Sequence, residues 1–184
     1  LWVREQLLAE MDVPKLTPAP DQGPERFESG TVNAEAMAGT TAAVEFLAGL
    51  AGDGGKPKAE AALTRKARLG QFFRELSERE GSLLARLWEG LDAIPGVTLY
   101  GPPPGQDRAP TLSFSVAGVG SREVSSRLAD EAAAFLSHGN FYAATAVERL
   151  GMKEEGLARA GISIYTTPEE VDRLISGVAR IAGS

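Results

Sequence analysis

The sequence predicts an α+β fold in which helices pack on a small, mostly antiparallel sheet. Three observations support this prediction. Residues 33–50 and 59–91 carry apolar side chains at three- and four-residue spacing, which is the period of an amphipathic helix. After Pro95-Gly96 the apolar period changes to two, which indicates strands. Strands and helices then alternate up to a helix with strong start signals near the C-terminus.

Composition excludes several classes of protein. The chain has 184 residues, 43% of them hydrophobic, and a mean hydropathy of −0.12, so it can bury a core of one domain or one and a half. A net charge of −6 and a pI near 5.0 give no basic surface for nucleic acid. Without cysteine there is no disulfide, thiolate metal site or cysteine nucleophile. No apolar run approaches the roughly 20 residues of a membrane span. We therefore expect a cytoplasmic protein without metal, nucleic-acid or membrane partners.

The N-terminal region begins with Leu1–Val3, which we interpret as the tail of a strand whose sheet lies upstream; a processed or tag-cleaved natural terminus is the alternative. Residues 4–12 predict a short helix. Prolines between residues 14 and 24 predict an extended crossing. Residues 33–50 then have helical composition with many Ala and Gly residues, which allow close approach of another helix.

A glycine-rich linker at residues 51–57 marks the best internal boundary, so we divide the chain into residues 1–55 and 56–184. Residues 59–91 carry the longest helical pattern. Its apolar stripe is interrupted at residues 80–81, which predicts a kink or break there.

The C-terminal region continues with strands at residues 97–100 and 111–116. Ser121 is expected to cap a helix, and residues 133–136 are expected to form a buried strand that leads to the single histidine, His138. A further helix is predicted from about residue 142 to residue 150.

The last strand and helix have the clearest pattern. Apolar and polar residues alternate along the strand, and Thr167-Pro168-Glu169-Glu170 supplies an N-cap, a first-turn proline and a capping-box glutamate. The apolar face of the strand comprises Ala158, Ala160, Ile162 and Ile164. The opposite face comprises Arg159, Gly161, Ser163 and Tyr165.

Arg159 is the first candidate for a functional residue. A guanidinium on a rigid strand presents a planar fork that matches a carboxylate, which suits binding of an α-amino acid. From spacing alone, an edge-strand arginine paired with a surface acid is the favoured alternative.

Gly30, Thr31 and Asn33 precede a helix and offer backbone N–H groups, a hydroxyl and a helix dipole that together bind phosphate; an ordinary turn and cap is the commoner use. His138, as a lone histidine, is expected to be structural. The Asn140–Tyr142 loop could line a cleft or cap the helix that follows it.

Three blocks, residues 26–33, 138–143 and 159–172, resemble in order and spacing the closing half of class V aminotransferases, and most closely the group of cysteine desulfurase-like proteins. The resemblance covers nearly the whole chain. It implies a fold-type I pyridoxal-phosphate enzyme, with residues 1–55 as a remnant of the large cofactor domain carrying a dimer-interface helix. Residues 56–184 would then be the small C-terminal α+β domain.

The resemblance also implies roles for individual residues. Gly30 and Thr31 would reach the phosphate of pyridoxal 5'-phosphate bound to the neighbouring subunit of a homodimer. Arg159 would bind the carboxylate of a small amino-acid substrate. Asn140 and Tyr142 are our further candidates for binding this substrate.

Two departures from the family limit the expected activity. The family lysine that holds the cofactor as a Schiff base would lie upstream of Leu1, and no lysine of this chain stands in a similar context, so we expect the chain alone to be inactive. Cysteine desulfurases carry a nucleophilic cysteine in the loop matched by residues 140–142, which has none here. A transaminase, lyase or epimerase activity of a longer parent protein therefore fits as well as desulfuration.

Two other functions remain open. The missing lysine and the small-residue helix at residues 33–50 are compatible with a self-contained, non-catalytic binding or dimerisation module. A hydrolase is disfavoured, because one histidine and no cysteine leave little from which to build a nucleophile and its base.

Overall fold

The computed structural model describes residues 3–52, 63–106 and 108–183. It divides into two units, Leu1–Arg68 and Leu69–Ser184. The boundary that the sequence predicts between residues 55 and 56, most of the glycine-rich linker, and the start of the helix predicted from residue 59 lie outside the described residues.

The first unit contains α1 (Glu5–Glu10) and α2 (Ala34–Gly49), in agreement with the two predicted helices. It also contains a 3-10 helix, η1 (Pro24–Phe27), at the end of the predicted extended crossing, where no helix was predicted. The Asn33 side chain caps α2, where Oδ1 accepts a hydrogen bond from the Ala36 N–H at 2.8 Å. Val3, the described part of the predicted strand tail, lies outside any strand. Among the described residues up to Arg68, Ala48 is the one buried hydrophobic residue.

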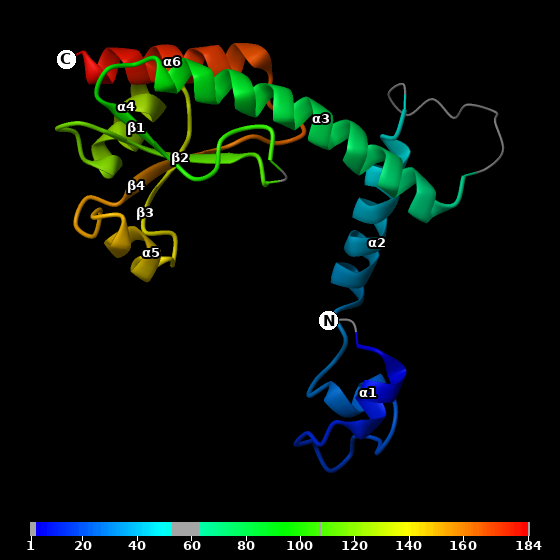
Figure 1. The fold of residues 1–184 in the computed structure, drawn as a ribbon. Helices are drawn as coiled ribbons and strands as arrows, with labels where there is room; N and C mark the ends of the chain where they lie inside the picture. Colours follow the sequence, from blue (N-terminus) through cyan, green and yellow to red (C-terminus); the bar gives the residue numbers. More distant parts are fainter. Residues whose placement is uncertain (1–2, 53–62, 107, 184) are drawn as a thin grey trace. The chain divides into compact units, whose positions relative to one another are not determined.

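A four-stranded sheet forms the centre of the second unit (Figure 1). Its strands follow the order β1-β2-β4-β3, and every neighbouring pair is antiparallel. This confirms the predicted fold class. The strands are β1 (Val97–Tyr100), β2 (Thr111–Val116), β3 (Ser137–Gly139) and β4 (Leu157–Gly161).

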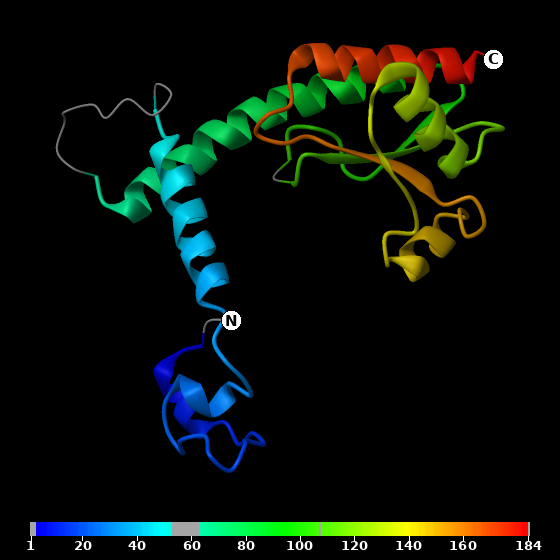
Figure 2. The same cartoon turned by 180° about the vertical axis from the view of Figure 1, so that it is seen from behind.

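Three helices provide the core that covers one face of this sheet: α3 (Arg65–Asp92), α4 (Ser121–Ala132) and α6 (Pro168–Ala182). Figures 1 and 2 show α6 running alongside the C-terminal part of α3, where Arg86 and Asp172 form an ion pair at 2.5 Å. Within the described ranges, no helix combines the length and apolar character that crossing a membrane requires. The core residues that are less than 2% exposed include Leu87, Leu91, Leu112, Phe114, Val124, Leu128, Val178 and Ile181.

The start of α6 has the predicted capping box. The Thr167 hydroxyl accepts from the Glu170 N–H at 3.2 Å, and the Glu170 carboxylate accepts from the Thr167 N–H at 2.9 Å. Pro168 occupies the first helical turn, where its missing N–H needs no partner. The sequence therefore defined this helix start correctly.

A break in the helix at residues 80–81 and a cap at Ser121 were both expected, and the structure has neither. Helix α3 continues through Glu80 and Gly81 without a break, because one glycine costs a helix only about 1 kcal/mol and the leucines that follow are buried. Ser121 is the first residue of α4, and Gly120 is its N-cap. The Ser121 hydroxyl instead donates to the Glu155 carbonyl oxygen at 2.6 Å.

The strand predicted at residues 133–136 was also wrong. Ala133 ends α4 in the left-handed conformation, with φ 47°. The chain then crosses to the sheet, with Phe135 86% exposed and Leu136 packed against the core. Strand β3 starts at Ser137, so His138 lies within the strand. The apolar residues 133–136 therefore form a connecting segment that packs partly against the core, and not a strand.

The polar face predicted for the last strand is shorter than expected. Strand β4 ends at Gly161, and residues 163–166 form a turn. In this turn the Ser163 N–H donates to the Thr166 hydroxyl at 3.0 Å, and the Thr166 N–H donates to the Ser163 carbonyl at 2.9 Å. Tyr165 consequently lies at an exposed turn.

Candidate functional site

A row of polar residues crosses the face of the sheet opposite the core. Tyr100 pairs with Ser113, Ser113 pairs with Arg159, and Arg159 pairs with Ser137. Residues directly opposite each other in antiparallel strands point to the same face. These four residues, the polar row, therefore place two hydroxyl groups beside Arg159, one on each neighbouring strand. Ser113, Ser137 and Tyr100 were not among the sequence-predicted candidates.

Arg159 lies on an inner strand, because β4 sits between β2 and β3. Its guanidinium carbon is 4.1 Å from the centre of the Phe141 ring. Within the described part of the chain, no carboxylate lies at ion-pair distance from Arg159. The alternative of an edge-strand arginine paired with a surface acid is therefore wrong. The half-buried guanidinium is stacked on a ring and has its N–H groups available.

The loop that carries Phe141 has an unusual backbone. Gly139, Phe141 and Tyr142 have φ of 108°, 53° and 59°, and a bulky residue rarely adopts such values. Asn140 holds the loop, because its Oδ1 accepts from the Tyr142 N–H at 3.1 Å and its carbonyl accepts from the Ala143 N–H at 2.7 Å. The helix predicted from residue 142 consequently begins later, as α5 (Ala144–Arg149).

The candidates Asn140 and Tyr142 have different surroundings in this loop. The Asn140 side chain is a loop-forming group, and the Tyr142 ring is fully exposed. No side chain caps α5, so the capping role considered for this loop is not observed. Placement of the loop beside Arg159 depends on the pairing of β3 with β4, which brings Ser137 opposite Arg159.

The backbone of Gly156 lies very close to the backbone of Gly139, at the start of this loop. Gly156 has φ 63°, and a Cβ atom added there would lie 2.7 Å from the Gly139 Cα. Only glycine permits this approach without a shift of the backbone. The turn before β4 is thus pressed against the end of β3.

Gly30 and Thr31 belong to the first unit. Both are exposed and precede α2, and a Cβ atom added at Gly30 would meet nothing within 4 Å. The Asn33 side chain is used in capping α2. The turn therefore offers an accessible Thr31 hydroxyl and an unobstructed backbone beside a helix N-terminus.

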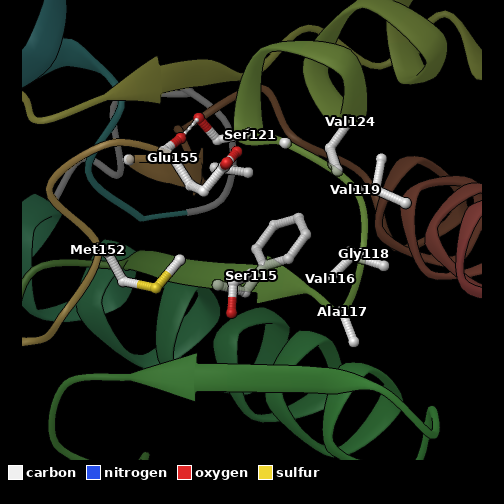
Figure 3. A pocket seen from close by; sticks show the side chains of 13 residues that line it. Ser115, Val116, Ala117, Gly118, Val119, Ser121, Val124, Met152 and Glu155 are labelled. Carbon is white, nitrogen blue, oxygen red and sulfur yellow. Dashed lines mark hydrogen bonds between the residues drawn. The ribbon is translucent and has the colours of Figure 1, made fainter.

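Two hollows in the second unit lie apart from the polar row. One has a volume of about 410 Å³ and lies between the end of β2, the start of α4 and the turn before β4. Figure 3 shows Met152, Glu155 and Val119 among the residues that line it. The other, of about 320 Å³, is lined by Phe135, Tyr165 and core residues. Neither is lined by Arg159, Asn140 or Tyr142.

Two of the three lysines that the structure describes are paired with acids. Lys15 pairs with Asp21 at 3.1 Å, and Lys153 pairs with Glu148 at 3.0 Å on the exposed surface. Lys66 is exposed on α3, and Lys56 and Lys58 lie outside the described residues.

The fold is that of solved cysteine desulfurase structures. The apo structure of cysteine desulfurase from Thermococcus onnurineus NA1 matches with a TM-score of 0.71 and 23% identity, covering 99% of this chain and 42% of that chain. A cysteine desulfurase from Escherichia coli matches with a TM-score of 0.70 and 22% identity, covering 96% of this chain and 40% of that chain.

Sequence comparison defines the family. The profile of Aminotransferase class-V matches residues 60–174. The chain is 32% identical over 157 residues to probable cysteine desulfurase 2 of Mycobacterium leprae, covering 85% of this chain and 32% of that protein. It is 31% identical over 160 residues to a cysteine desulfurase of Escherichia coli, covering 87% and 33%. The chain belongs to the class V aminotransferase family, and it spans about a third of the length of these relatives.

The resemblance of the sequence to this family is thereby confirmed. Class V aminotransferases are generally pyridoxal-phosphate-dependent and act on amino acids.

Proposed function

We propose that this chain supplies the substrate-carboxylate site of a pyridoxal-phosphate-dependent enzyme that acts on a small amino acid. The observation that carries the proposal is Arg159, whose guanidinium lies on an inner strand with no carboxylate partner among the described residues. A half-buried guanidinium is less screened by solvent than an exposed one, so a carboxylate ligand that binds it gains more from the opposite charge.

The surroundings of Arg159 fit a carboxylate ligand. A guanidinium donates two parallel hydrogen bonds to the two oxygens of a carboxylate, and the ring of Phe141 covers a face that these bonds do not use. Ser113 and Ser137, on the two neighbouring strands, add hydroxyl groups that donate or accept. Together these groups favour a small ligand that carries a carboxylate and a second polar group, such as an amino acid.

The residues of the first unit fit the phosphate of the cofactor. The exposed Thr31 hydroxyl, the open Gly30 backbone and the N-terminus of α2 are donors of the kind that bind phosphate. When bound, pyridoxal phosphate stabilises negative charge that develops on the substrate. We propose that Thr31 donates to this phosphate across a homodimer, and that the lysine that anchors the cofactor belongs to a segment that this sequence does not include.

The residues of the site are compatible with several types of reaction on an amino acid. The chain has no cysteine, and the loop at residues 140–142 presents the exposed Tyr142 phenol. A thiol nucleophile is therefore not supplied by these residues. Transamination, lyase and epimerase chemistry are as compatible with the site as desulfuration by another route.

Titration of the chain with L-alanine and with propionate tests the proposal, with the Arg159 Nε–H signal followed by NMR. Both ligands are expected to shift this signal. Arg159→Gln is expected to weaken binding by at least about tenfold, because hydrogen bonds to charged groups contribute about 1.5–3 kcal/mol. Arg122→Gln, on the exposed face of α4, is the matched control and is expected to bind normally. Equal binding by the Arg159→Gln variant would refute the proposal.

One observation favours a second candidate, a dimerisation module without catalysis. Met37 and Phe46 on α2 are 61% and 64% exposed, which is unusual for large apolar side chains. Sedimentation velocity discriminates the two. A stable dimer of the chain that binds neither ligand would favour the module over the substrate-binding function.

A further inference from the structure

The contact between Arg159 and Phe141 joins two segments that are separate in sequence. Their distance of 4.1 Å, from the guanidinium carbon to the ring centre, is well within the roughly 6 Å range of cation–π attraction. Phe141 is half-buried, in contrast to the fully exposed Tyr142 next to it. The ring is therefore held against the arginine, although its neighbour projects into solvent.

The loop fixes this ring before any ligand binds. Two consecutive non-glycine residues, Phe141 and Tyr142, have positive φ, and the Asn140 side chain and carbonyl hold the turn through two hydrogen bonds. Gly156 presses the turn before β4 against Gly139 at the start of the loop. Strained backbone persists only where the surrounding structure determines it, and it concentrates at binding and catalytic sites.

A fixed ring limits how the guanidinium can rotate. An arginine side chain loses much rotamer freedom when it binds a ligand in one geometry. Stacking on Phe141 removes part of that freedom in advance and leaves the N–H edges of the guanidinium free. Pre-organisation of this kind increases affinity without an additional contact to the ligand.

We propose that Phe141 is a positioning residue, which holds the Arg159 guanidinium in the plane that binds the substrate carboxylate. The inference rests on the proposed function of Arg159 and adds a residue that does not itself touch the ligand. The left-handed backbone conformation of Phe141 would then serve to place its ring against Arg159 on β4.

Substitutions at residue 141 in the full chain test this inference. Phe141→Leu keeps an apolar side chain and removes the aromatic face, whereas Phe141→Tyr restores that face. Two quantities are measured in each variant: the ring-current shift of the Arg159 Nε–H signal in the free protein, and the dissociation constant of propionate.

The expected result is a paired loss and rescue. Phe141→Leu should remove the ring-current shift and weaken propionate binding by about three- to tenfold, and Phe141→Tyr should restore both. Phe135→Leu is the matched control, and it should change neither, because the Phe135 ring is 86% exposed and Arg159 stacks on Phe141 instead.

Other outcomes would contradict either the positioning role of Phe141 or the proposed function of Arg159. If Phe141→Leu removes the ring-current shift but binds propionate as the unsubstituted chain does, the positioning role is wrong and the proposed function stands. If Phe141→Tyr restores the shift without restoring affinity, the role is also wrong. If the unsubstituted chain and Arg159→Gln are equally unresponsive to propionate, the proposed function fails, and this inference fails with it.

Discussion

Glu80 illustrates how the environment of a single side chain sets its ionisation. Partial burial raises the pKa of the Glu80 carboxyl above its ordinary value of 4.5, and the neighbouring Arg79 opposes this by lowering it. Arg79 itself is engaged elsewhere, because its guanidinium donates to the carbonyl oxygens of Ile164 and Thr166 at 2.8 and 2.6 Å. Desolvation consequently outweighs attraction at Glu80.

The raised pKa of Glu80 predicts a small pH-dependent loss of stability. Because the folded state holds this proton more tightly, stability is expected to fall as the pH rises from 4.5, the ordinary value, through the folded-state pKa. Glu80→Gln removes this dependence, so the variant should gain stability relative to the unsubstituted chain above pH 4.5 and not below it. Urea unfolding across this range measures the difference. If the free energies of unfolding of the two proteins differed by the same amount at every pH, the prediction would be wrong.

The end of α4 shows, at the scale of an element, how a local backbone conformation overrides an apolar pattern. Residues 133–136 contain four apolar side chains and resemble a buried strand, yet Ala133 has φ 47° and redirects the chain. Glycine is the usual residue at such a left-handed position after a helix. An alanine there gives no sequence signal, so the strand boundary could not be predicted.

The same conformation predicts that Ala133→Gly stabilises the protein by about 1 kcal/mol, because glycine adopts positive φ without the steric cost that alanine carries. Ala133 is exposed, so no packing is lost. Ala129→Gly, in the middle of the same helix, is the matched control and should destabilise by about 1 kcal/mol. Chemical denaturation measures both changes, and the two should have opposite signs.

At the scale of the second unit, the packing of α4 against α6 depends on a glycine. A Cβ atom added at Gly177 would lie 2.6 Å from Leu128 Cδ2 and 3.2 Å from Ala132 Cβ. Leu128 is fully buried, so it has little room to move. The absence of a side chain at Gly177 therefore sets how closely the two helices approach.

Gly177→Ala is consequently expected to destabilise the protein by about 1–3 kcal/mol through overpacking. Gly81→Ala, within α3, is the contrasting variant, because a Cβ there would meet nothing within 4 Å and should stabilise the helix by about 1 kcal/mol. Thermal unfolding of both variants measures the effect. A neutral Gly177→Ala would show that α4 and α6 have freedom to move apart.

Periodic features could be predicted from the sequence, whereas features that depend on strand pairing could not. The capping box at Thr167 and the alternating strand around Arg159 need only local sequence. The roles of Phe141, Ser113 and Ser137 depend on register between strands far apart in the chain. A single sequence without strand partners does not specify that register.

The hydrogen bonds from Arg79 have a consequence for tolerance to substitution. Both acceptors are main-chain carbonyls, which every amino acid supplies at positions 164 and 166. The two bonds from Arg79 therefore survive a change of side chain at either position, although Thr166 has a further role because its hydroxyl accepts from the Ser163 N–H. Arg79 itself cannot be replaced in this way. Even lysine has a single donor nitrogen and lacks the planar fork with which the guanidinium reaches two carbonyl oxygens.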